Sequence, residues 1–124
     1  NMEQCYQYFL DAYHFRPQRL EALYYLLSYY RVKEPYKGYS YGMLAYPYLN
    51  NYPKDILFVD HLVHKYLFKD ELSLCAYSIE NYILSKKLNL YILDHQNDND
   101  YDFDRISENI NWCNKLLLKT VFNI

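Results

Sequence analysis

The sequence predicts an all-α protein built from short antiparallel helical hairpins, and two observations support this fold class. Leu20, Leu23, Leu27 and Tyr30 recur every three or four residues, a spacing that places them on one face of a helix. The chain also has only two glycines and four prolines in 124 residues, too few for an all-β fold with a turn about every 8 to 12 residues. A short helix with one apolar face cannot bury that face alone, so several helices must pack together.

About six helices are expected, and they span residues 2–15, 18–31, 36–46, 61–79, 82–93 and 103–122. Pro17 separates the first two, because the residue before a proline is disfavoured in the α conformation. Pro35 suits the start of the third helix, where the missing N–H of a proline costs nothing. Asp60 is expected to cap the fourth helix, and Asp102 or Asp104 the sixth, by accepting hydrogen bonds from free backbone N–H groups.

The third helix holds both glycines of the protein, Gly38 and Gly42, and Ala45 continues the same stripe. A glycine inside a helix costs about 1 kcal/mol relative to alanine, so two of them need a compensating reason. We expect the backbone of a neighbouring helix to approach closely along this stripe.

The segment between the third and fourth helices contains the only cluster that suggests a metal site. Residues 47–53 are expected to form a turn, and the apolar run 56–59 is either a short strand or part of the connector. A strand is disfavoured, because the run has only four residues and the sequence contains no second run of this kind with which it could pair. Asp60, His61 and His64 could ligate zinc, but no fourth ligand is implied, so a helix cap and two packed histidines are the favoured interpretation. No metal and no cofactor is therefore expected.

The C-terminal part of the chain is expected to be a polar acidic loop over residues 94–102 followed by the closing helix. The aspartate spacing of the loop is that of a calcium site, but Asp102 stands at the sixth position counted from Asn97, where an EF-hand needs glycine. A solvated loop is therefore favoured. The last helix has Trp112 at its flank and an apolar stripe of Ile106, Ile110, Cys113, Leu117 and Val121.

Charge and hydropathy argue against two classes of partner. The formal net charge is −2, without the clustered Lys and Arg that phosphate binding requires, so neither nucleic acid nor an anionic membrane is expected. No apolar run approaches the roughly 20 residues that span a bilayer. Cys5, Cys75 and Cys113 are odd in number and lie in apolar stripes, which predicts buried, reduced thiols in an intracellular, cytoplasmic protein. Buried thiols are inert, and no catalytic set is found.

Superposing the hairpins gives a repeat of about 34 residues, the period of tetratricopeptide repeats. The matching positions are Cys5, Phe9, Ala12 and Pro17 in one second helix, Leu23, Leu26, Leu27 and Tyr30 in the next first helix, and Gly38, Gly42 and Ala45 in its second helix. Leu27 stands where the motif has a small residue, and the first-helix tryptophan is absent. The chain thus resembles a degenerate tetratricopeptide-like array, a single helical-repeat domain over residues 1–124 that is expected to be part of a longer protein.

Three phrases carry a narrower resemblance: YFLDAYHFRPQRLEALYYLLSYYR, YPKDILFVDH and KDELSLCAYSI. In order and spacing they resemble the helical region that accompanies family 2 glycosyltransferase domains in bacterial and giant-virus proteins. The likeness covers about residues 5–90, and NINWCNKLL resembles the closing helix of that region. It implies an accessory region, and a location in the host cytoplasm for a viral protein, but it carries no catalytic residue onto this chain.

In a tetratricopeptide-like array the first helix of each unit lines the concave face. The side chains expected there are Tyr24, Ser28, Arg31, Tyr66, Asp70, Ser73 and Tyr77. Tyrosines and an arginine suit a peptide or a glycan, although tyrosines that merely cover the core explain the pattern equally well. The expected function is a non-catalytic module for protein interaction. The alternatives are the acceptor-binding part of a glycosyltransferase and a structural or virion scaffold.

Overall fold

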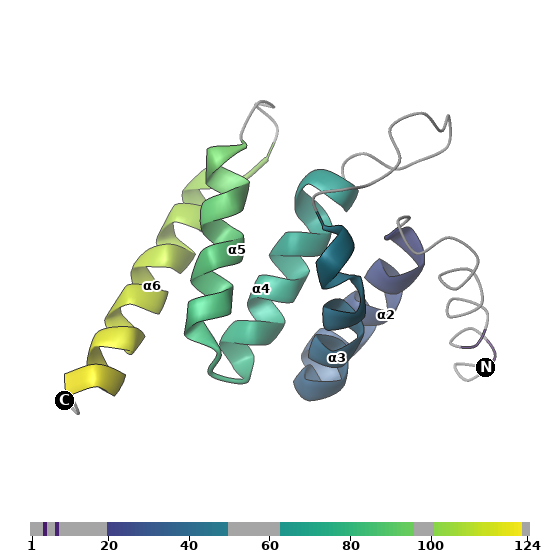
Figure 1. The fold of residues 1–124 in the computed structure, drawn as a ribbon, viewed down its shortest axis with the longest axis horizontal. Helices are drawn as coiled ribbons and strands as arrows, with labels where there is room; N and C mark the ends of the chain where they lie inside the picture. The colour runs from purple at the N-terminus through teal and green to yellow at the C-terminus, as the bar shows by residue number, and fades with distance from the viewer. Residues whose placement is uncertain (1–3, 5–6, 8–19, 50–62, 96–100, 123–124) are drawn as a thin grey trace.

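The computed structural model describes residues 4, 7, 20–49, 63–95 and 101–122, and within them every regular element is helical (Figure 1). The α-helices are α2 (Glu21–Lys33), α3 (Pro35–Ala45), α4 (Phe68–Ser78), α5 (Tyr82–Asp94) and α6 (Phe103–Phe122). A short 3-10 turn, Tyr46–Tyr48, follows α3, and a π turn, Val63–Leu67, leads into α4. The all-α prediction is confirmed. Of the expected helix over residues 2–15, only residues 4 and 7 are described, and both are helical. The run 56–59 and the Asp60 cap lie outside the described residues.

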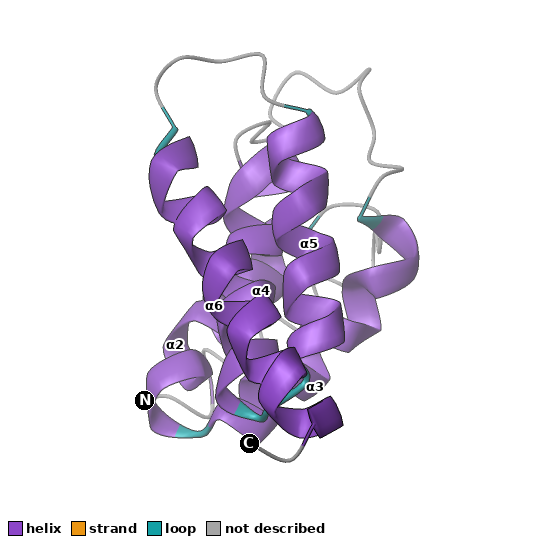
Figure 2. Ribbon diagram, turned by 90° about the vertical axis from the view of Figure 1, so that its left-hand side faces the viewer, coloured by secondary structure: helices purple, strands orange, loops and turns teal. Residues whose placement is uncertain are grey.

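The helices form a row in which consecutive members are antiparallel neighbours (Figure 1). α2 packs against α3, α4 against α5, and α5 against α6. α4 also contacts α2 and α3, and so connects this first pair of helices to α5 and α6. The view turned by 90° shows helices and the loops between them throughout the described part of the chain (Figure 2). No described helix is both long and apolar enough to cross a membrane.

The core follows the apolar stripes of the sequence. Leu23, Leu26, Leu27 and Tyr30 of α2 are buried as expected and pack with Leu72 of α4 in the main cluster. A smaller cluster at the other end of the molecule contains Tyr66, Ile92 and Ile106.

The glycine stripe of α3 lies against two neighbouring helices, and the expected close approach of a helix backbone is met at Gly38. A Cβ atom on Gly38 would lie 3.2 Å from the backbone nitrogen of Arg31 in α2, and one on Gly42 would lie 2.4 Å from Cδ1 of Leu72 in α4. Both glycines are buried. A side chain at position 38 would therefore press on the backbone of α2, and one at position 42 would have to displace the side chain of Leu72.

Local signals account for the helix boundaries. α3 begins at Pro35, one residue earlier than expected. The break between α4 and α5 is made by Glu80, which has a φ of 68° in the left-handed region, and by Asn81, whose Oδ1 accepts from the backbone nitrogen of Leu84 at 3.2 Å. At α6 the cap is Asp102, which accepts from the backbone nitrogen of Arg105 at 3.1 Å.

The C-terminal end of α6 differs from the prediction. Ile106, Ile110 and Cys113 are buried, but Val121 is 73% exposed, so the last turn of the expected stripe is not covered. The reason is length: α6 has 20 residues and its neighbour α5 has 13, a difference of about 10 Å at 1.5 Å per residue. α6 therefore extends beyond the helix on which it packs (Figure 1).

Candidate partner-binding surfaces

The structure buries three of the seven side chains expected on a concave face. Tyr66 and Ser73 have no exposed surface, and Asp70 is 6% exposed. The hydroxyl of Tyr66 donates to the carbonyl of His95 at 3.0 Å, and Ser73 Oγ donates to the carbonyl of Asp70 at 2.7 Å. The prediction that these three present an exposed surface is therefore wrong, because each has its polar group satisfied inside the protein.

Asp70 is the centre of a polar network that joins α4 to α6. The guanidinium group of Arg105 donates to both carboxylate oxygens, with Nη1 3.1 Å from Oδ1, and the hydroxyl of Tyr101 donates to Oδ2. The hydrogen bond and charge of Asp70 raise the pKa of Arg105, and burial together with the same carboxylate raises the pKa of Tyr101. The ring of Tyr101 also stacks on Tyr66, with centroids 4.9 Å apart. This paired, hydrogen-bonded network has the character of a structural contact between helices.

The other four predicted residues are partly exposed. Tyr24 and Ser28 are half-buried on α2, and Arg31 at its end forms an ion pair with Glu71 of α4. Desolvation raises the pKa of Glu71, and Arg31 opposes that shift. Tyr77 lies near the end of α4, where its ring meets that of Tyr82 edge to face with centroids 5.3 Å apart. Whether these four bind a partner stays a prediction.

Tyr77 lines a cavity of about 330 Å³ between α4, α5 and α6, which we call the α6 pocket. Its walls are formed by Leu74, Tyr77, Ser85, Asn109 and Trp112. Trp112 is 49% exposed, so one part of its ring is open to a ligand while the rest packs on the protein. The pocket therefore combines an aromatic surface with two polar side chains.

Asn109 gives the α6 pocket its specific chemistry. Its Nδ2 is buried and has no hydrogen-bond partner among the described residues. A buried amide without a partner costs free energy, about 1 to 3 kcal/mol, unless a bound group or a water supplies an acceptor. The sequence reasoning assigned no role to Asn109 and noted Trp112 only as a flanking residue. Their spacing of three residues, off the buried stripe of α6, is the signal that could have identified them.

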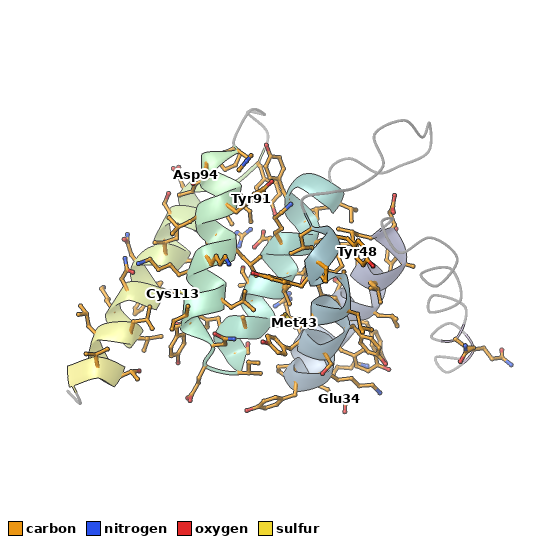
Figure 3. The ribbon with its side chains drawn as sticks, viewed as in Figure 1. Glu34, Met43, Tyr48, Tyr91, Asp94 and Cys113 are labelled. Carbon is orange, nitrogen blue, oxygen red and sulfur yellow. The ribbon has the colours of Figure 1, made fainter. Side chains whose placement is uncertain are left out.

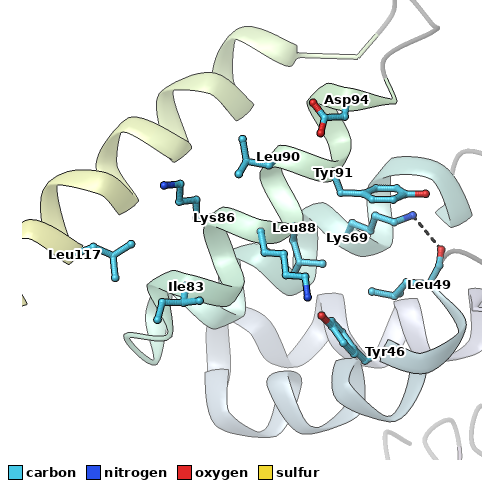
Figure 4. Close-up of a pocket in the computed structure, with 11 residues that line it drawn as sticks. Tyr46, Leu49, Lys69, Ile83, Lys86, Leu88, Leu90, Tyr91, Asp94 and Leu117 are labelled. Atoms are coloured by element: carbon cyan, nitrogen blue, oxygen red, sulfur yellow. Dashed lines mark hydrogen bonds between the residues drawn. The ribbon is translucent and has the colours of Figure 1, made fainter.

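A second cavity, of about 580 Å³, follows α5, and we call it the α5 groove (Figure 4). Its apolar lining is formed by Tyr46, Leu49, Ile83, Leu88, Leu90, Tyr91 and Leu117. Its charged side chains are Lys69, Lys86, Lys87 and Asp94. None of these was predicted from the sequence to bind a partner, because they come from four separate segments of the chain.

Lys69 is a buried residue of the α5 groove lining. It is 2% exposed, its Nζ donates to the carbonyl of Leu49 at 3.1 Å, and the same atom lies 4.6 Å from the centre of the Tyr91 ring. Burial disfavours the charged ammonium and lowers the pKa of Lys69 to about 8.

The described cysteines are buried and unpaired, as expected. Burial raises the pKa of the Cys75 thiol to about 12, so it is a poor nucleophile at neutral pH. Cys113 lies on the side of α6 that faces α5 (Figure 3). Cys5 lies outside the described residues, as do Asp60 and His61 of the cluster considered for zinc.

The two cavities thus differ in character, because the α6 pocket is aromatic with a free amide donor and the α5 groove is apolar with several lysines. Within the described ranges, no group of three or more His, Cys, Asp or Glu side chains could hold a metal ion. Comparison of the chain with protein-family models, curated proteins and solved structures finds no match.

Proposed function

We propose that this chain is a non-catalytic helical module that binds a segment of another protein at the α6 pocket. The resemblance of its sequence to the helical region that accompanies family 2 glycosyltransferases supports a narrower form of the proposal, in which the partner is such an enzyme. The module would then position that enzyme or hold it in a complex.

The unpartnered Nδ2 of Asn109 is the observation that carries this proposal. A ligand with an acceptor oxygen would satisfy it, and the peptide carbonyl is the acceptor that every protein segment offers. Trp112 and Tyr77 would meanwhile contact an apolar side chain of the same segment. Aromatic side chains of this kind contribute much of the binding energy in protein interfaces.

The test is selection of peptides from a displayed random library, with binding measured by intrinsic fluorescence. Trp112 is the only tryptophan of the chain, so its emission reports directly on the pocket. We expect the selected peptides to shift that emission and to lose at least about tenfold in affinity with Asn109→Asp, which replaces the amide donor by an acceptor of the same shape.

The matched control is Asn111→Asp, the same substitution at an exposed position of the same helix. It should leave the affinity unchanged, and circular dichroism should show both variants folded. Equal affinities for Asn109→Asp and Asn111→Asp would show that the pocket is not the binding site.

A glycan is the second candidate ligand, because an aromatic ring beside an amide also suits a sugar. The same protein applied to a glycan array separates the two ligands. Binding of an oligosaccharide that is lost in Asn109→Asp, with no peptide selected, would replace the protein-interaction proposal by the acceptor-binding alternative.

A further inference from the structure

The outer side of α5 exposes apolar side chains that the rest of the described chain leaves uncovered. Ile83 is 71% exposed and Leu90 is 40% exposed. They are seven residues apart, two helical turns, and so lie on the same face of the helix. Both line the α5 groove, together with Leu117 of α6 (Figure 4).

The charged side chains of this groove are mostly basic, although the chain as a whole has a formal net charge of −2. Lys86 and Lys87 sit between Ile83 and Leu90 in the sequence, and Asp94 is the acidic residue of the groove lining. Among the described residues no carboxylate forms an ion pair with Lys86 or Lys87. Their charges are therefore available to a partner.

The positions of the lysines indicate the shape of that partner. Lys86 extends towards α6, whereas Lys69 lies on the other flank of α5 (Figure 4). The Nζ of Lys87 lies 6.0 Å from the centre of the Tyr46 ring. Because Tyr46 directly follows α3, Lys87 lies on the side of α5 that faces the end of α3. A compact anion could not reach both flanks, but a peptide with several carboxylates could.

We propose that the α5 groove is a second docking surface, which binds an acidic amphipathic segment of a partner protein. Apolar residues of that segment contact Ile83 and Leu90, and its carboxylates pair with Lys86 and Lys87. The charge complementarity of the groove selects this partner over a basic or a wholly apolar one. The proposal is independent of the α6 pocket, because the two surfaces share no lining residue.

The experiment uses three dye-labelled helical peptides of equal length and measures binding by fluorescence anisotropy. One has a leucine stripe with glutamates on either side, the second has lysine in place of each glutamate, and the third has serine in place of each leucine. We expect only the leucine–glutamate peptide to bind, and we expect added salt to weaken its binding because the pairs are near the surface. Its binding should also shift the backbone amide resonances of Ile83, Lys87 and Leu90 in NMR spectra of the labelled protein.

The decisive variant carries Lys86→Glu and Lys87→Glu, with Lys115→Glu and Lys119→Glu on α6 as the control of equal charge. Lys87, Lys115 and Lys119 are exposed and Lys86 is partly exposed, so both variants should fold, as circular dichroism checks. We expect the first pair of substitutions to weaken binding at least about tenfold and the second pair to have a much smaller effect. The proposal is overturned if the two variants bind equally, if the lysine peptide binds as well as the glutamate peptide, or if no peptide binds at millimolar concentration. Trp112→Ala should leave this binding unchanged, which separates the α5 groove from the α6 pocket.

Discussion

Replacing Gly42 by alanine measures how tightly α3 packs against α4. The added Cβ would lie 2.4 Å from Cδ1 and 3.3 Å from Cγ of Leu72, which is fully buried in the main cluster. Alanine gains about 1 kcal/mol of helix propensity over glycine, whereas overpacking a filled core costs about 1 to 3 kcal/mol. Because the contact is so short, we expect overpacking to dominate. The free energy of unfolding should fall by about 1 to 2 kcal/mol, a decrease in Tm of roughly 3 to 9 °C.

A double-mutant cycle measured by urea denaturation isolates the cause. Leu72→Ala removes the atoms that the new Cβ would meet, so in that background Gly42→Ala should stabilise the protein by about 1 kcal/mol through helix propensity alone. Ser40→Ala, on the exposed side of α3, leaves the packing unchanged and reports helix propensity together with the loss of the hydrogen bond from Ser40 Oγ to the carbonyl of Tyr36. If Gly42→Ala stabilised the parent protein as much as it stabilised the Leu72→Ala variant, the close packing of α3 on α4 would be refuted.

Three further outcomes are expected. Arg105→Gln should lower the free energy of unfolding by about 2 to 3 kcal/mol, because the carboxylate of Asp70 stays buried without its cation. Lys115→Gln, at an exposed position of the same helix, should change the free energy of unfolding by less than about 0.5 kcal/mol. Equal effects of the two substitutions in urea denaturation would argue against the ion pair. The pKa of Lys69 is about 8 in the folded protein, against an ordinary value of 10.5 in the unfolded chain. Between these pH values the unfolded chain binds more protons, so the free energy of unfolding should rise with pH, by up to about 3 kcal/mol. Lys69→Met should lack this rise, and parallel curves for the two proteins from pH 8 to 10.5 would contradict the inferred burial of the charge. The pKa of the Cys75 thiol is raised to about 12, so at pH 8 this thiol should react with a disulfide reagent only as fast as the protein unfolds. Mass spectrometry locates the labelled cysteine. Rapid labelling of Cys75 in the folded protein would show that the thiol is accessible.

Local sequence signals predicted most of the described fold. The boundaries of α5 and α6 follow from Asn81 and Asp102, which cap their helices with their own side chains. The close approach of α3 to its neighbours follows from the cost of glycine in a helix, which only tight packing can compensate. The exposed end of α6 was not predictable in this way, because it depends on how far the neighbouring helix extends.

The buried polar residues show where reasoning from periodicity fails. Asp70 and Ser73 have the spacing of an exposed polar face on α4, and they were interpreted as part of a binding surface. Their partners are distant in the sequence: Arg105 follows Asp70 by 35 residues, and Asn89 follows Ser73 by 16. A helical pattern alone cannot distinguish a carboxylate that faces water from one that meets an arginine of another helix.

The ion pair between Asp70 and Arg105 lies one helical turn from Asn109, the residue on which the proposed binding at the α6 pocket depends. Arg105 and Asn109 are one turn apart on α6. The ion pair with Asp70 that holds Arg105 therefore also fixes the position of Asn109 relative to α4. For a ligand bound in the pocket as proposed, we expect its binding and the ion pair to stabilise each other by the same free energy, because such coupling is reciprocal. Arg105→Gln would then weaken the binding of the ligand, although Arg105 does not line the pocket. A bound ligand would in turn slow the hydrogen exchange of the backbone amides in the first turns of α6.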